Sequence, residues 1–198
     1  MTTFLLIRHG AHNLLDRVLV GRTAGVELSQ AGRRQARRIA RQLAGERITA
    51  VQSSPQARTL QTAQPIAARV GCPIDVAQAI DEIDAGAWTG QSFADLARDP
   101  QWTRWNRARG SARPPRGESM RELQIRVARH MNNVAAAAPD GRVVMVTHAE
   151  VIRAAVLHVL RLPLDDFHRV EIAPASISTI AVEGNRADVV SLNRPVAP

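Results

Sequence analysis

The alternation of short apolar runs with amphipathic segments is the feature that most constrains the fold of this chain. Residues 3–7 (TFLLI) form a continuous apolar run, which is typical of a strand buried on both faces. Residues 142–147 (RVVMVT) are rich in β-branched residues and predict the strongest strand of the sequence. Strands that alternate with helices indicate a three-layer α/β/α sandwich around a mostly parallel sheet.

Capping and turn residues set the bounds of the other predicted elements. Ser29 and Ser119 are helix N-caps, and Glu122 completes a capping box with Ser119. Gly184 and Asn185 form a turn between two strand-like runs, which predicts a C-terminal hairpin. The predicted helices cover residues 29–43, 56–70, 119–138 and 149–160, and the remaining predicted strands cover residues 48–52, 74–76, 176–182 and 187–192.

Residues 83–117 interrupt the alternation of strands and helices. This stretch holds all three tryptophans of the chain and ends in a Pro114-Pro115 pair. We expect it to form a lid-like insertion whose Trp102 and Trp105 lie in the wall of a pocket, with Trp88 as the first candidate for the core. Because no repeat or linker divides the sequence, residues 1–198 are predicted to form a single domain.

Arginine supplies all of the positive charge that the lysine and arginine count of this chain represents. All 26 basic residues are Arg, and the formal net charge is +8. The arginines are spread along the whole chain and only three Phe, three Trp and no Tyr accompany them, so we expect a compositional bias and no nucleic-acid partner. A single cysteine, Cys72, excludes an internal disulfide and a Cys-based zinc cluster.

The apolar runs are too short for a membrane anchor. The only early run, residues 4–7, ends at Arg8 and is shorter than a signal-peptide core or a membrane span. We therefore expect a soluble cytoplasmic protein with no membrane partner, and a homodimer is left open.

Two histidines follow predicted strands. His9 comes directly after the first strand and His148 directly after the strongest one, and each has an arginine in or close to its motif. In open α/β sheets, ligands bind outside the carboxyl ends of the strands. We therefore expect His9 and His148 to lie in one site at that edge of the sheet.

Six motifs in order resemble those of the histidine phosphatase superfamily, which includes the cofactor-dependent phosphoglycerate mutases. The resemblance covers nearly the whole chain and implies a phosphoglycerate mutase-like fold. The motifs are LLIRHG (5–10), GRTAGVELSQAGRRQA (21–36), SSPQARTLQTA (53–63), EIDAGAWTG (82–90), RGES (116–119) and VTHAEVIRA (146–154).

The resemblance implies a phosphatase that acts on phosphate monoesters without a metal ion or a cofactor. Arg8, Arg58 and His148 form the cage around the phosphate oxygens, and their positive charge replaces that of a metal. His9 is the nucleophile that forms a phosphohistidine, since a neutral imidazole is nucleophilic at cellular pH. Gly10 lets the backbone approach the phosphate closely.

The same resemblance selects a general acid. Glu82 is implied as the proton donor to the leaving oxygen, although Asp81 and Asp84 compete with it on spacing alone. Arg22 is implied as a contact to a distal group of the substrate. Ala149 is small enough to keep the turn after the second histidine and is expected at the phosphate.

The chain also departs from the family pattern. Where the family usually has Glu, then Thr, and an Asn further on, this sequence has Ala11, His12 and Leu15. His12 and Asn13 are candidates for the missing phosphate contact. Glu150 brings a negative charge near the cage, which could orient His148 or select a cationic group of the substrate.

Three other functions remain open at this point. A mutase is the first alternative, but the larger mutases of the family carry segments in the middle and at the end of the chain that this sequence lacks. A metal hydrolase could use His9, His12, His148, Asp84 and Glu150, although no H-E-x-x-H motif is present. A non-catalytic protein that binds phosphate ligands is the third.

Overall fold

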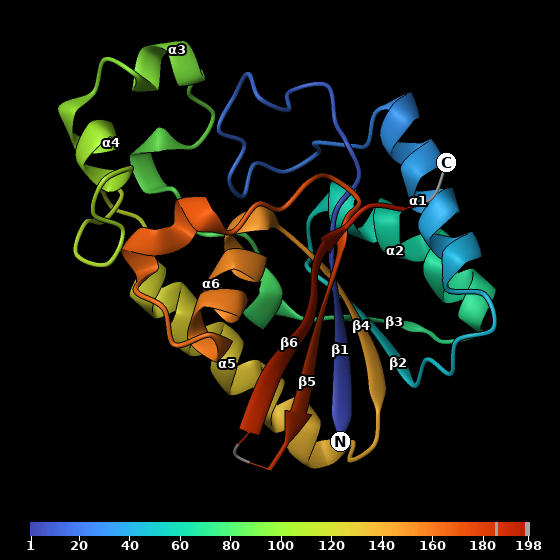
Figure 1. Cartoon of the computed structure of the whole chain (residues 1–198). Coiled ribbons are helices and arrows are strands. Elements are labelled where there is room, and N and C mark those ends of the chain that lie inside the picture. The colour runs from blue at the N-terminus through green and yellow to red at the C-terminus, as the bar shows by residue number, and fades with distance from the viewer. Residues whose placement is uncertain (185, 197–198) are drawn as a thin grey trace.

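A mostly parallel sheet forms the centre of the protein (Figure 1). The computed structural model describes residues 1–184 and 186–196. The strands of this sheet follow the order β3-β2-β4-β1-β5-β6. Strands β1 to β4 run parallel to one another, whereas β5 pairs antiparallel with β1 and β6 pairs antiparallel with β5. The strands are β1 (Thr2–Arg8), β2 (Ala50–Ser53), β3 (Ile74–Val76), β4 (Arg142–Thr147), β5 (Ile177–Glu183) and β6 (Arg186–Arg194).

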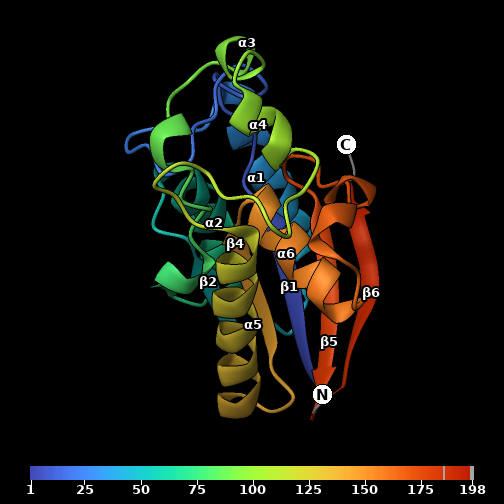
Figure 2. The same cartoon turned by 90° about the vertical axis from the view of Figure 1, so that its left-hand side faces the viewer.

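Helices cover both faces of the sheet. Figure 1 shows α1 and α2 on one face and α5 and α6 on the other, and Figure 2 shows α5 and α6 from their own side. This arrangement confirms the predicted three-layer sandwich. The four covering helices are α1 (Gln30–Gln42), α2 (Ala57–Val70), α5 (Met120–Ala137) and α6 (Ala149–Val159).

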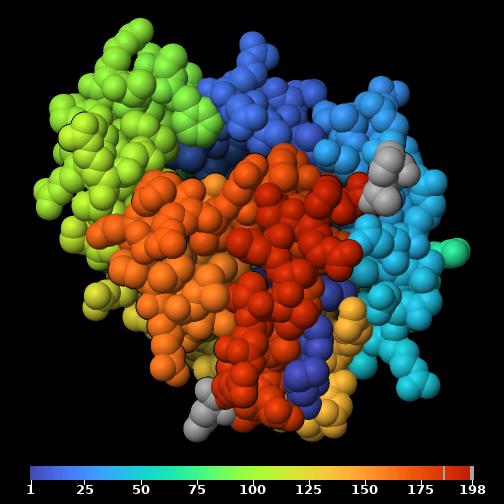
Figure 3. Space-filling model, viewed as in Figure 1, coloured from blue at the N-terminus to red at the C-terminus, as the bar shows by residue number. Residues whose placement is uncertain are grey.

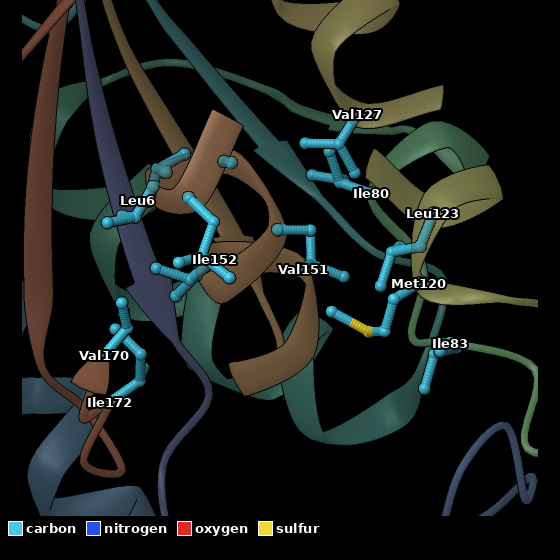
Figure 4. Close-up of a cluster of buried hydrophobic side chains, with 14 of the residues drawn as sticks. Leu6, Ile80, Ile83, Met120, Leu123, Val127, Val151, Ile152, Val170 and Ile172 are labelled. Carbon is cyan, nitrogen blue, oxygen red and sulfur yellow. The ribbon is translucent and has the colours of Figure 1, made fainter. Parts of the chain in front are cut away.

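Strand β1 is apolar on both faces because each face packs against a helical layer. Leu5 and Ile7 belong to the core shared with α1 and α2. Phe4 and Leu6 belong to the larger core shared with α5 and α6, part of which is drawn in Figure 4. The alternation of side chains along a strand places neighbours on opposite faces. A continuous apolar run therefore becomes a strand that is covered twice.

The predicted caps are confirmed. The Ser29 hydroxyl accepts the Gly32 N–H at the start of α1. The Ser119 hydroxyl accepts the Glu122 N–H, and the Glu122 carboxylate accepts the Ser119 N–H in return. Strands β5 and β6 form the predicted hairpin, while Asn185 in its turn lies outside the described residues. In those described residues, no helix combines the length and the apolar character that a membrane crossing requires.

The insertion, residues 83–117, has a narrow neck. It holds the short helices η2 (Gly86–Trp88), α3 (Phe93–Leu96) and α4 (Pro100–Trp105). At its base the Ala87 N–H donates to the Pro115 carbonyl at 2.9 Å, and the Glu118 N–H donates to the Asp84 carbonyl at 2.8 Å. The two chain segments of the neck approach so closely that a Cβ on Gly86 would lie 2.1 Å from the Pro115 oxygen.

The tryptophans of the insertion pack into the larger core that α5 and α6 share. Trp88, expected in the core, is 2% exposed and donates from Nε1 to an Asp99 carboxylate oxygen at 2.8 Å. The expectation that Trp105 lines a pocket is wrong, because it is 3% exposed and is covered by the Arg109 guanidinium, 4.8 Å from its ring. Trp102 is half-buried, with its ring centroid 5.3 Å from that of Trp88.

Candidate active site

The carboxyl edge of the sheet brings the two motif histidines together. Strands β1 and β4 pair in parallel with Arg8 opposite Thr147, so the residues that follow them, His9 and His148, emerge side by side. Their ring centroids lie 5.2 Å apart. Figure 3 shows the insertion and residues 11–28 as two neighbouring surfaces above this edge.

His9 is buried and its ring is held in one tautomer. Its Nδ1 lies 2.8 Å from the Gly10 carbonyl oxygen. Because a carbonyl only accepts, Nδ1 carries the proton and Nε2 keeps its lone pair. Burial, together with the nearby Arg58 and Arg8, holds the pKa of His9 well below its usual value. The imidazole is therefore neutral at physiological pH and can act as a nucleophile through Nε2.

The loop after His9 is held by the start of α1. The Ala11 carbonyl accepts from the Ser29 hydroxyl at 3.0 Å, and the Ala11 N–H donates to the Gln35 side chain at 2.9 Å. A Cβ on Gly32 would lie 2.1 Å from the Ala11 oxygen, and a Cβ on Gly10 would lie 2.7 Å from the Gly32 oxygen. Gly10 is thus required by packing against α1, a reason separate from the expected approach to phosphate.

Arg58 reaches the site from the first turn of α2. It shares one helix face with Thr62, whose hydroxyl accepts the Gly10 N–H at 3.1 Å. Its Nη2 donates to the Gly21 carbonyl at 2.7 Å and lies 3.2 Å from His148 Nδ1. Its Nε and Nη1 are buried without a hydrogen-bond partner in the described part of the chain.

Arg8 complements Arg58 from the end of β1. Its Nη1 donates to the Ile172 carbonyl at 2.7 Å, and its Nε is buried without a partner within residues 1–184 and 186–196. Burial lowers the pKa of both guanidiniums, yet a guanidinium keeps its charge at physiological pH. Unpaired N–H groups on two buried cations favour an anion with several acceptor oxygens.

His148 is oriented by two residues whose role was missed in the sequence. Its Nε2 lies 2.8 Å from the Ser54 hydroxyl, which donates to an Asp81 carboxylate oxygen at 2.9 Å. The hydroxyl therefore accepts the Nε2 proton, and His148 Nδ1 faces Arg58. Burial, with Arg58 as the next cause, lowers the pKa of His148 well below its usual value. Ser54 stands four residues before Arg58 in the same motif, which was the available signal.

The three candidate acids have different surroundings. Asp81 accepts from Ser54, from the Gln56 amide at 3.0 Å and from the Glu82 N–H at 2.8 Å, so its oxygens are occupied. Asp84 accepts the Gly86 N–H at 2.9 Å in the neck of the insertion. Asp81 Oδ1 lies 3.7 Å from His148 Nε2, on the side of the ring that Ser54 occupies. Glu82 Oε2 lies 3.6 Å from His148 Nδ1, on the side that faces Arg58.

The environment of Glu82 suits proton transfer near neutral pH. Its Oε1 accepts the Ile83 N–H at 2.9 Å, and its side chain is 15% exposed. Burial raises the pKa of Glu82 to about 7, against the opposing effect of Arg58. A carboxyl group with this pKa is present in both protonation states at physiological pH, as an acid that later serves as a base requires.

Arg22 binds the backbone of Glu82 and the side chain of Glu118. Its Nε donates to the Glu82 carbonyl at 2.7 Å, and its Nη2 donates to the Glu118 carboxylate at 3.2 Å. Its side chain is 38% exposed. The contact to a distal group of the substrate stays a prediction. Ala149, at the first position of α6, is half-buried beside His148.

His12 joins the cluster, whereas Asn13 does not. The His12 ring is buried with its centroid 5.4 Å from that of His9, and its Nδ1 is without a partner in the described ranges. Burial, together with Arg58 and Arg8, lowers the pKa of His12 to about 4. Asn13 is exposed. Of the two candidates for the missing phosphate contact, the structure favours His12.

Glu150 is neutralised by two arginines. Arg109 Nη1 donates to one of its carboxylate oxygens at 2.5 Å, and Arg153 Nη1 donates to the other at 2.8 Å. Burial by itself raises the pKa of Glu150, but Arg109 and Arg153 outweigh it and hold the pKa below its usual value. Both of its oxygens bind arginines, so Glu150 offers no free charge to a cationic group of a substrate.

In the ranges that the structure describes, no group of three or more His, Cys, Asp and Glu residues has an arrangement that could hold a metal ion. The charged and titratable groups of the site are the imidazoles of His9, His12 and His148, the guanidiniums of Arg8 and Arg58, and the Glu82 carboxyl, whose pKa is raised.

Known proteins share the sequence and the fold of this chain over most of its length. The chain is 29% identical over 198 residues to phosphoserine phosphatase 1 of Hydrogenobacter thermophilus, covering 98% of this chain and 92% of that protein. It is 27% identical over 182 residues to the probable phosphoglycerate mutase GpmB of Cronobacter sakazakii, covering 91% and 85%. Its fold superposes on YhfR of Bacillus stearothermophilus with a TM-score of 0.92 and 25% identity over 98% of both chains.

The family match spans residues 4–195, which includes all the motifs and every residue of the site. The chain belongs to the histidine phosphatase superfamily (branch 1).

Proposed function

We propose that this chain is a phosphatase that hydrolyses phosphate monoesters of small metabolites through a phosphohistidine on His9, without a metal ion. The observation that carries this function is the state of His9. Its Nδ1 proton is tied to a carbonyl, so the lone pair of Nε2 is free. Beside it lie buried N–H groups of Arg8 and Arg58 that have no partner in the described residues.

In the first step, the dianionic phosphate binds to the free N–H groups of Arg8 and Arg58 and to the N-terminus of α6 at Ala149. His148 holds the Arg58 guanidinium, because its Nδ1 accepts from Arg58 Nη2 while its Nε2 proton is bound by Ser54. His9 Nε2 attacks phosphorus, so an N–P bond forms while the P–O bond to the leaving group breaks. Protonated Glu82 gives its proton to the departing oxygen, which is worth roughly 10²- to 10⁴-fold for a poor leaving group.

In the second step, the Glu82 carboxylate takes a proton from water, and the water oxygen attacks phosphorus. The N–P bond breaks, inorganic phosphate leaves, and His9 and protonated Glu82 are restored. Both steps therefore use one carboxyl in opposite protonation states, which its pKa of about 7 allows.

Access to the site supports a role for the insertion as a lid. His9 is 4% exposed, Arg58 2% and His148 0%, so a substrate can reach them only when part of the cover moves. Residues 87–115 join the rest of the chain at the neck between Asp84 and Glu118, and they also bind residues 17–19 through the backbone and Glu150 through Arg109, so opening of the segment breaks these contacts. We propose that this movement admits the substrate.

The test uses two substitutions and two kinds of substrate. His9→Ala should abolish turnover of an aryl phosphate while the protein stays folded, because no other group can form the intermediate. Glu82→Gln should release a burst of aryl alcohol and then turn over slowly, because the first step needs little protonation and the second needs a base. Labelled phosphate should accumulate on this variant in an acid-labile, base-stable form.

Three outcomes would contradict the mechanism. Substantial activity in His9→Ala would exclude the covalent step. Unchanged hydrolysis of alkyl phosphates by Glu82→Gln would exclude Glu82 as the acid. Activity that is lost with a chelator and regained with a divalent cation would favour a metal hydrolase instead.

A phosphoglycerate mutase-type transfer is the second candidate, since one relative bears that name. Incubation with 3-phosphoglycerate, with and without a bisphosphoglycerate primer, separates the two: a phosphatase releases inorganic phosphate and a mutase releases the isomer. Phosphoserine belongs in the same panel because another relative is named a phosphoserine phosphatase. A cytoplasmic location, the absence of a nucleic-acid partner and a homodimer stay predictions.

A further inference from the structure

Arginine side chains hold the backbone around Glu82. Residues 79–84, which we call the acid loop, run from within η1 (Gln78–Ile80) to the neck of the insertion. Three carbonyls of this loop, those of Ala79, Asp81 and Glu82, accept hydrogen bonds from arginine side chains.

Arg126, on α5, makes most of these bonds. Its Nη1 donates to the Ala79 carbonyl at 2.8 Å. Its Nη2 lies 2.8 Å from the Asp81 carbonyl oxygen and 3.2 Å from the Glu82 carbonyl oxygen, and its two N–H groups are shared between these carbonyls and Glu118. One planar guanidinium thus binds three carbonyls along four residues, which a single ammonium group cannot reproduce.

Glu118 orients this guanidinium. Its Oε1 accepts from Arg126 Nε at 2.6 Å, and its Oε2 accepts from Arg126 Nη2 at 2.9 Å, a bidentate pair. The same Oε2 also accepts from Arg22 Nη2 at 3.2 Å and from the Asp84 N–H at 3.3 Å. Because Arg22 comes from the segment after the nucleophile, Glu118 links that segment to the acid loop.

We propose that Arg126, oriented by Glu118, is a positioning residue that sets the reach of the Glu82 carboxyl. This inference rests on the proposed function. The Glu82 Oε2 lies at the imidazole cluster, 3.6 Å from His148 Nδ1. Proton transfer requires this carboxyl to lie about 2.6–3.2 Å from the leaving oxygen of the bound substrate. A displacement of about 1 Å in such a group can cost on the order of 10²-fold in rate.

The leaving group distinguishes this role from a merely structural ion pair. A positioning residue for the acid affects substrates that need a proton, whereas a loss of stability affects all substrates alike. Arg126→Gln should therefore lower kcat for an alkyl phosphate by ~10- to 100-fold. The burst rate with an aryl phosphate should stay within about twofold of that of the unchanged protein, because that step needs little protonation.

Three companion variants sharpen the test. Arg126→Lys keeps the charge but not the fork, so it should not restore the alkyl rate, and it replaces Arg126→Gln if that variant fails to fold. Glu118→Gln should reproduce the same split between substrates. Arg121→Gln is the matched control: Arg121 lies on the same helix but is exposed, so this variant loses the same charge away from the acid loop and should behave like the unchanged protein.

A double variant separates failure of this inference from failure of the proposed function. In the Glu82→Gln background, Arg126→Gln should add nothing further to the loss of alkyl phosphatase activity. If Glu82→Gln by itself leaves the alkyl-to-aryl ratio unchanged, the proposed acid is wrong. If Glu82→Gln changes that ratio but Arg126→Gln lowers both rates equally and in step with Tm, the positioning role is wrong and the function stands.

Discussion

The raised pKa of Glu82 predicts that this residue destabilises the fold at neutral and alkaline pH. The carboxyl has a pKa of about 7 in the folded protein, mainly because it is buried, against 4.5 for the free side chain. Below about pH 4.5 it is protonated in both states and has no such effect. As the pH rises from about 4.5 to about 7, the carboxyl ionises in the unfolded chain but stays protonated in the buried site, so stability is lost over this range and is constant above it.

The size of the effect follows from the difference between the two pKa values. Each pH unit of that difference corresponds to about 1.4 kcal/mol of unfolding free energy, which makes about 3 kcal/mol at pH 8. Glu82→Gln keeps the shape and still accepts the Ile83 N–H, but it cannot ionise. The variant should therefore gain about 3 kcal/mol at pH 8 and nothing at pH 4. For a chain of this length, that gain raises Tm by roughly 6–12 °C.

Calorimetry of both proteins between pH 4 and pH 9 measures this directly. The difference in Tm should open between about pH 5 and pH 7 and then level off. A difference that is independent of pH, or that grows toward acidic pH, would refute the assignment of a raised pKa to Glu82. Asp84→Asn is a matched control, because that carboxylate accepts the Gly86 N–H in the neck, away from the imidazoles.

Two further predictions concern packing. Gly32→Ala should lower stability and activity together, because its Cβ would lie 2.1 Å from the Ala11 oxygen in the loop after the nucleophile. Gly110→Ala is the control: its Cβ would meet nothing closer than 3.4 Å, so denaturant unfolding and turnover should both stay unchanged. Trp105→Ala should lower the free energy of unfolding in urea by about 3–5 kcal/mol, because Trp105 is buried. Trp102 is half-buried, so Trp102→Ala should lower that free energy by less and should change the relative rates with different substrates. Equal losses of stability in the two variants would contradict this view of the insertion.

Local patterns made the elements of this fold predictable. A continuous apolar run from Thr3 to Ile7 can only be covered on both faces, and it is strand β1 of a twice-covered sheet. Ser119 and Glu122 act within one helical turn, so their capping box was visible in the sequence. The positions of His9 and His148 after two strands also predicted their meeting, because parallel strands end at the same edge.

The partners of the site residues came only from the tertiary structure. Ser54 and His148 are 94 positions apart in the chain, and Arg109 and Glu150 are 41 positions apart. Such pairs carry no period or spacing that a sequence pattern could register. Ser54 was therefore missed as the support of the second histidine, and the charge of Glu150 was expected to be available.

The succession of strands and helices along the chain and the helix caps were predictable, since each depends on neighbours within a few positions. The contacts of each side chain were not, because they depend on how distant segments pack. The tertiary structure buried Trp105 beneath Arg109, directed Arg22 to the carbonyl of Glu82, and removed Glu82 from water so that its pKa rose. Burial depends on elements that pack from distant parts of the chain, and burial gives this carboxyl its chemistry.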